Sequence, residues 1–89
     1  MVHALIVRIA QKAIEKPLLY YGRKFDIRVW VLVTPAFEVY YYNTPYMRTS
    51  SSVYTTDSLN SEIHLTNNCQ QKHFTEYSKY EDGNTIPMR

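Results

Sequence analysis

The chain lacks most of the features that assign a protein to a class. It has one cysteine, Cys69, so an internal disulfide is excluded and a reducing, intracellular setting is favoured. The net charge is +2 and the basic residues form no stripe, which argues against a nucleic-acid partner. The start, MVHALIVRIA, is shorter than the roughly 20 apolar residues that span a bilayer, and it has no signal-peptide cleavage site. We therefore expect neither nucleic acid nor a membrane as partner.

Glycine and reactive motifs are also scarce. Two glycines occur in 89 residues, whereas a small domain with several tight turns normally uses more, so a slice of a larger fold with long strands is indicated. No CxxC, HExxH, GxSxG, GxGxxG or phosphate-binding loop motif is present. His3, His64 and His73 do not have the spacing of zinc ligands with Cys69, so we expect no metal-binding residues in the chain.

What is present is a globular composition, with 45% hydrophobic residues and nine tyrosines, in a length that makes at most one small domain. Its clearest pattern is an alternation over residues 24–34, which predicts a β-strand with two different faces. One face begins with three charged residues, Lys24, Asp26 and Arg28. The other face is wholly apolar and is expected to point into the core: Phe25, Ile27, Val29, Val31 and Val33.

The residues after this strand predict a hairpin. A short connection at residues 35–36 leads to a second strand over residues 37–43, FEVYYYN, which is rich in strand-forming residues. Residues 43–45, Asn-Thr-Pro, predict a turn. A third, short strand, YMRTSS, is expected over residues 46–51.

The two ends of the chain give weaker signals. Residues 4–15 begin like a strand and continue with good helix formers, so a strand or a helical turn is expected before Pro17, which ends either one. From Cys69 onward the chain is polar, and we expect mostly loop.

Two polar stretches admit two interpretations each. The charged face of the first strand is either a solvent-facing row of salt bridges, each contributing ~0–1 kcal/mol, or the floor of a cleft. Trp30 and Leu32 continue that face, and two cations with a carboxylate would suit a polyphosphate and its magnesium. The segment HLTNN, residues 64–68, either binds sugar and phosphate oxygens or is a polar turn that satisfies its own backbone.

Three stretches, in this order and at these separations, resemble the tubulin–tyrosine ligase family: AQKAIEKPLLYYGRKFDIRVWVLVT, YMRTSS and HLTNNCQQK. The resemblance extends from about Ile6 to Asn84, and the segment YSKYEDGN leans toward the tyrosine ligases within a family that also includes polyglutamylases and glycylases. It implies an α/β (α+β) fold, an ATP-grasp fragment with mostly antiparallel strands of the central sheet, loops and little helix. It also implies that residues 1–89 form a partial domain, without its N-terminal and C-terminal parts.

The activity that this resemblance implies is ATP-dependent ligation. ATP, with Mg²⁺, converts a carboxylate of the tubulin tail to an acyl phosphate, and the amine of tyrosine, glutamate or glycine attacks it to form an amide. The implied partners are tubulin and a free amino acid, and the implied location is cytoplasmic, at the cytoskeleton or a cilium. The rival interpretation is a non-catalytic remnant that binds nucleotide weakly or serves as an interaction fragment.

The resemblance also assigns site residues, position by position. Arg28 and Arg48 match an arginine pair near the terminal phosphate and the substrate carboxylate, where preorganised cations stabilise phosphoryl transfer. Eight residues match nucleotide-binding positions: Gln11, Ile14, Lys24, Asp26, His64, Leu65, Thr66 and Asn67. Ala13 stands where an aromatic residue is usual, which predicts altered packing at the adenine. The magnesium ligands are expected outside this segment, so the 89-residue chain alone is expected to be inactive.

Overall fold

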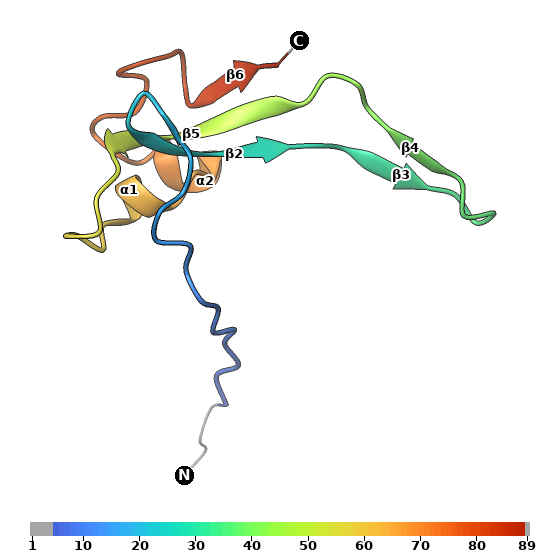
Figure 1. Ribbon diagram of the computed structural model, residues 1–89, viewed down its shortest axis with the longest axis horizontal. Helices are drawn as coiled ribbons and strands as arrows, with labels where there is room; N and C mark the ends of the chain where they lie inside the picture. The colour runs from blue at the N-terminus through green and yellow to red at the C-terminus, as the bar shows by residue number, and fades with distance from the viewer. Residues whose placement is uncertain (1–4, 89) are drawn as a thin grey trace.

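The structure of the protein, a computed structural model, describes residues 5–88 (Figure 1). In chain order the elements are β1 (Leu19–Tyr20), β2 (Arg23–Arg28), β3 (Val31–Val33), β4 (Val39–Tyr41), β5 (Tyr46–Val53), α1 (Ser61–His64), α2 (Asn68–Gln71) and β6 (Thr85–Pro87). Antiparallel strands dominate and both helices are single turns. The predicted α+β class with little helix is confirmed.

Four strands form an antiparallel sheet in the order β1-β2-β5-β6, and β3 pairs with β4 in a separate two-stranded sheet. The register places Asp26 opposite Arg48 in the first sheet and Leu32 opposite Tyr40 in the second. The chain therefore runs outward through β2 and β3 and returns through β4 and β5. The β3–β4 hairpin projects from the rest of the molecule as an arm (Figure 1).

The strand predicted over residues 24–34 is interrupted, because β2 ends at Arg28 and β3 begins at Val31. The returning chain is interrupted at the same level, where Pro45 has no N–H to donate to a continuous ladder. The predicted turn at residues 43–45 is therefore wrong: the chain bends there without reversing, and β5 remains antiparallel to β2. The predicted hairpin is confirmed, as is the following strand, which extends to Val53.

The N-terminal stretch has no regular structure. Of the strand or helical turn predicted over residues 4–15, residue 4 lies outside the described residues, and the rest is an exposed, irregular chain. A single turn of helix is unstable without tertiary packing, which explains the outcome despite good helix formers. The stretch is connected to the sheet where the Tyr54 hydroxyl donates to the carbonyl oxygen of Glu15 at 2.8 Å.

The C-terminal part is more ordered than the sequence predicts. The expectation of loop from Cys69 onward is wrong at α2 and at β6, which pairs Ile86 with Met47 at the edge of β5. A three-residue strand that ends in a proline shows no usable alternation, so nothing in the polar composition indicates it.

The core is small and mainly polar. The buried hydrophobic side chains are Met47 and Ile63, whereas the most completely buried large side chains are Gln71, Asn84, Thr49 and Ser50. The apolar face of the first strand was expected to supply the core, and this expectation is wrong. Ile27 is 49% exposed and Val29 is 46% exposed, and Phe25 is only half-buried.

Candidate functional site

The middle of the charged row on β2 is a carboxylate held by two partners. Asp26 accepts hydrogen bonds from Nε and Nη2 of Arg48, on the neighbouring strand β5, each at 2.7 Å. The hydroxyl of Thr66 donates to the same carboxylate at 2.9 Å. The cross-strand register creates the pair, since Asp26 lies directly opposite Arg48. Three of the predicted site residues thus meet in one cluster.

The charges in this cluster stabilise one another. The side-chain hydrogen bond from Arg48 lowers the pKa of Asp26, and the Thr66 hydroxyl and the positive charge of Arg28 act in the same direction against the opposing effect of burial. The hydrogen bond with Asp26 likewise raises the pKa of Arg48. Asp26 is therefore a fixed anion that orients a fixed cation, in the bidentate geometry that suits arginine and carboxylate.

The remaining two cations of the row are free of carboxylates. Within residues 5–88, Arg28 and Lys24 have no ion pair, although Arg28 lies over the ring of Trp30 at 4.9 Å. Lys24 borders an open hollow of about 570 Å³ together with Ile14. Gln11 is exposed and lies in the irregular N-terminal stretch.

The HLTNN segment is divided between α1 and α2. His64 ends α1, with Nε2 2.7 Å from the carbonyl oxygen of Ser58 and its ring edge-on to Tyr54. Thr66 is buried, whereas Leu65 and Asn67 are exposed. Of the four predicted nucleotide-binding residues here, the structure joins only Thr66 to the cluster on β2.

Several polar residues that sequence reasoning missed form a second cluster behind the sheet. Arg23, 3% exposed, donates to Glu81 in a bidentate pair at 2.8 and 2.7 Å and to the carbonyl oxygen of Ser50. Thr49 donates to Glu81 as well. In the strand alternation, Arg23 falls on the same face as Phe25 and not on the face of Lys24, Asp26 and Arg28. This position could have predicted a buried cation that needs a partner.

The side chains of the site fit an anionic ligand better than a metal ion. No group of three or more potential metal ligands occurs within residues 5–88, and the Asp26 carboxylate is already engaged by Arg48 and Thr66. Lys24, Arg28 and the free Nη1 of Arg48 supply donors without carboxylate partners in the described chain. Such donors suit phosphate or carboxylate oxygens.

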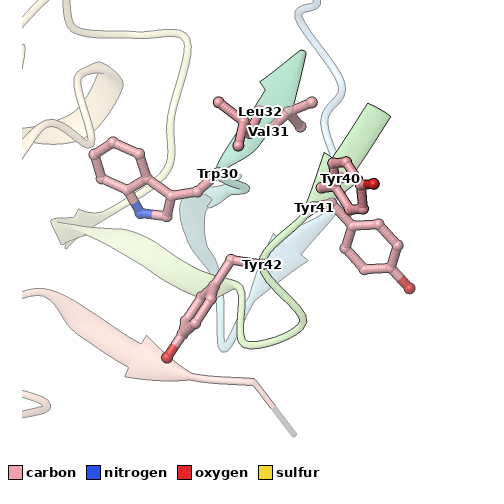
Figure 2. Close-up of a pocket in the computed structure, with 6 residues that line it drawn as sticks. All are labelled: Trp30, Val31, Leu32, Tyr40, Tyr41 and Tyr42. Carbon is pink, nitrogen blue, oxygen red and sulfur yellow. The ribbon is translucent and has the colours of Figure 1, made fainter. Parts of the chain in front are cut away.

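A separate, apolar hollow lies on the projecting arm (Figure 2). It has a volume of about 370 Å³ and is lined by Trp30, Val31, Leu32, Tyr40, Tyr41 and Tyr42. All six side chains are exposed, and the Tyr40 hydroxyl donates to Glu38 at 2.7 Å. Tyr42 also borders a second hollow, together with Thr85 and Pro87 of β6.

No helix within the described residues has the length and apolar character needed to cross a membrane.

Comparison with known proteins identifies the class. The model of the tubulin-tyrosine ligase family matches residues 4–88, which is nearly the whole chain, and the protein belongs to this family. Membership agrees with the ATP-grasp fold implied by the resemblance, and the α+β sheet fits it.

Several relatives of this chain are named as glycylases. The chain is 46% identical over 68 residues to a tubulin monoglycylase of Danio rerio, covering 74% of this chain and 9% of that relative. It is 43% identical over 67 residues to a tubulin monoglycylase of Homo sapiens, covering 73% of this chain and 9% of that relative. It is 46% identical over 69 residues to tubulin glycylase 3B of Drosophila melanogaster, covering 74% of this chain and 9% of that relative. The chain thus spans less than a tenth of their length, and these relatives do not support the lean of YSKYEDGN toward tyrosine ligases.

Proposed function

We propose that this chain is the central-sheet segment of an ATP-dependent ligase that joins a free amino acid to a carboxylate of the tubulin tail. The observation that carries the proposal is the cluster of Arg48, Asp26 and Thr66 beside the unpaired Arg28 and Lys24, in a chain whose family is the tubulin-tyrosine ligases. Three residues assigned by resemblance come together, and the charge beside them is positive. The chain belongs to this family, and both the tubulin-modifying activity and the specific reaction are our proposal.

Glycine is the amino acid that we propose. The relatives named above are glycylases, and one further relative, from Mus musculus, is a protein monoglycylase 44% identical over 66 residues. Among the three candidates, tyrosine, glutamate and glycine, only glycine appears in those names. Specificity for a substrate without a side chain requires a site that excludes larger ones, and the residues that would do so are to be sought in the rest of the ligase.

The residues of the cluster have distinct proposed tasks. When bound, ATP supplies the phosphoryl group that activates the tubulin carboxylate, with Mg²⁺ held by ligands outside this segment. Arg28 would contact the terminal phosphate, Arg48 would contact the substrate carboxylate, and Lys24 would contact phosphate oxygens. Asp26 is already engaged by Arg48, so its task is to hold that guanidinium in place, which lowers the reorganisation needed during phosphoryl transfer.

The remaining assigned residues have supporting tasks in the proposed site. Gln11 and Ile14 are proposed to line the adenine, His64, Leu65 and Asn67 to contact the ribose and phosphates, and Thr66 to support Asp26. Tubulin as partner and a cytoskeletal or ciliary location follow from the same proposal.

Transfer of labelled glycine to purified tubulin tests the function directly. The proposed full-length ligase should transfer label only when ATP and magnesium are both present. Arg28→Ala should abolish transfer, and Arg28→Lys should restore little of it, because lysine keeps the charge but not the planar donor fork. Arg8→Ala, an exposed arginine in the irregular N-terminal stretch, is the matched control and should keep wild-type activity.

Two results would contradict the proposal. A fully active, folded Arg28→Ala variant would remove Arg28 from the reaction, and label that appears without ATP would exclude the ligase mechanism.

The alternative, a non-catalytic remnant, makes a different prediction. Translation of the flanking nucleotide sequence would reveal stop codons on both sides, where a working ligase would continue into the segment with the expected magnesium ligands.

A further inference from the structure

Two buried amide side chains hold the backbone next to Thr66. Gln71 is 0% exposed and Asn84 is 1% exposed, although both are polar. The amide nitrogen of Gln71 donates to the carbonyl oxygen of Leu65, and Nδ2 of Asn84 donates to the carbonyl oxygen of Thr66 at 2.7 Å. Two consecutive carbonyls are therefore fixed by two different side chains, which we call the buried amide pair.

The other contacts of the buried amide pair are on β5. Oε1 of Gln71 accepts from the backbone N–H of Ser51 at 3.0 Å and from its hydroxyl. Nδ2 of Asn84 also donates to the carbonyl oxygen of Thr49 at 3.2 Å, and the N–H of Thr49 donates to the carbonyl oxygen of Asn84 at 2.8 Å. Each amide thus links β5 to the segment that follows α1.

The chemistry of these bridges needs a neutral amide. The carbonyl oxygens of Leu65 and Thr66 require donors, and a carboxylate of the same shape has none when ionised. Glutamate at position 71 or aspartate at position 84 would place a carboxylate oxygen against these buried carbonyl oxygens. The hydrogen bond would be lost and the two oxygens would repel each other. The sequence alone does not show this, because Gln71 and Asn84 both occur in polar stretches predicted to be loop.

Thr66 transmits this arrangement to the charged cluster. It is 6% exposed, and its hydroxyl donates to Oδ2 of Asp26 at 2.9 Å. The same oxygen accepts from Nη2 of Arg48. The position of the Thr66 hydroxyl therefore affects the carboxylate that orients the Arg48 guanidinium.

We propose that the buried amide pair, Gln71 and Asn84, positions the ligase site. By fixing two adjacent carbonyls against β5, the pair places the Thr66 hydroxyl on Asp26 and so sets the direction of the Arg48 guanidinium. This inference rests on the proposed function, because it assigns the cluster to the ligase site. Gln71 and Asn84 contact no substrate in this scheme and act only through Thr66.

Kinetics of glycine transfer by the proposed full-length ligase test the role. Asn84→Asp removes both donors in an isosteric change, and transfer efficiency should fall about tenfold, the size expected for buried acceptors left without donors. The matched control, Asn43→Asp, makes the same change at an exposed amide in the bend before β5 and should transfer at the wild-type rate. Gln71→Glu repeats the test at the second amide and serves where Asn84→Asp does not fold.

A double variant separates positioning from general stabilisation. Thr66→Val removes the hydroxyl and keeps the shape, so Asn84→Asp combined with Thr66→Val should be no slower than Thr66→Val alone. Losses that multiply would overturn the proposal, because the amide would then act independently of Thr66. An unchanged rate in both Asn84→Asp and Gln71→Glu would overturn it as well.

Amide hydrogen exchange gives a readout that does not depend on activity. Asn84→Asp should accelerate exchange over residues 61–67 and leave β2 unchanged, whereas equal acceleration in both would indicate a general structural role and overturn the inference. A wild-type protein that transfers nothing with ATP and magnesium would contradict the proposed function. The exchange pattern would still decide whether the pair positions Thr66.

Discussion

At the scale of single residues, two arginine–carboxylate pairs have opposite surroundings. Arg48 and Asp26 are partly exposed, with side-chain exposures of 18% and 39%, whereas Arg23 and Glu81 are nearly buried, at 3% and 16%. Both pairs are bidentate. The Arg48–Asp26 pair is the more accessible of the two, although Arg23 and Glu81 also border a hollow. Loss of one partner of the buried pair leaves an uncompensated charge, so the buried pair matters more for stability.

The first prediction concerns the pH dependence created by Glu81. Burial alone would raise the pKa of Glu81, but hydrogen bonds from Arg23 and Thr49 outweigh it and hold the pKa below its ordinary value of 4.5. A depressed pKa stabilises the folded state above the unfolded value and loses that effect as pH falls through the folded value. Glu81→Gln should therefore lower the free energy of unfolding by about 3 kcal/mol at pH 7, and the difference should shrink below about pH 4.5.

Chemical denaturation of the proposed full-length ligase at several pH values measures this difference. Asp82→Asn, at the exposed neighbouring carboxylate, controls for the loss of one negative charge. If the free energy of unfolding differs between wild type and Glu81→Gln by the same amount from pH 7 to pH 3, the ionisation of Glu81 is not linked to stability, and the prediction is wrong.

At the scale of elements, the tight turn between β1 and β2 depends on its glycine. The register leaves Tyr21 and Gly22 as a two-residue loop, and both have positive φ, 47° and 77°. Such loops favour glycine because a side chain is strained there. A Cβ at Gly22 would meet only Val53, at 3.8 Å, which is an ordinary contact. The cost of substitution is therefore conformational and not steric.

The second prediction follows from this turn. Gly22→Ala should lower the free energy of unfolding by about 1 kcal/mol, and Gly22→Asn should lower it less, since asparagine tolerates positive φ better than alanine. Thermal unfolding of the proposed full-length ligase measures both. Equal stability of all three proteins would show that the backbone here relaxes to a negative φ.

The elements also show how far the sequence could predict this fold and site. The hairpin could be predicted, because the period-two alternation and the Pro-Ala connection are local. The resemblance assigned Asp26 and Arg48 to one site but did not pair them, since cross-strand register joins residues 22 positions apart. The burial of Gln71 and Asn84 could not be predicted, because a polar residue shows no periodicity that distinguishes a buried bridge from a solvated loop. Arg23 falls between these cases, since the alternation places it on the apolar face of the strand but does not indicate its partner, Glu81.

At the scale of the whole molecule, the chain exposes more surface than its mass requires. Its accessible surface is 7706 Å², against about 5,500 Å² for a compact monomer of this size. The radius of gyration is 16.7 Å, against about 12 Å for a compact domain. The N-terminal stretch and the arm extend away from the rest of the molecule (Figure 1), and the six residues that line the aromatic hollow of the arm are exposed.

The third prediction treats the 89-residue chain by itself. Incubated with tubulin, ATP, magnesium and labelled glycine, it should transfer no label at any ATP concentration. Phosphoryl transfer requires metal ions that bridge the phosphates, and residues 5–88 contain no cluster able to hold one.

The chain should nonetheless bind ATP weakly through Lys24 and Arg28, so calorimetric titration should detect binding that Arg28→Ala weakens. Labelled tubulin would contradict the assignment of the magnesium ligands to other parts of the ligase, and equal ATP binding by Arg28→Ala would remove Arg28 from the nucleotide site.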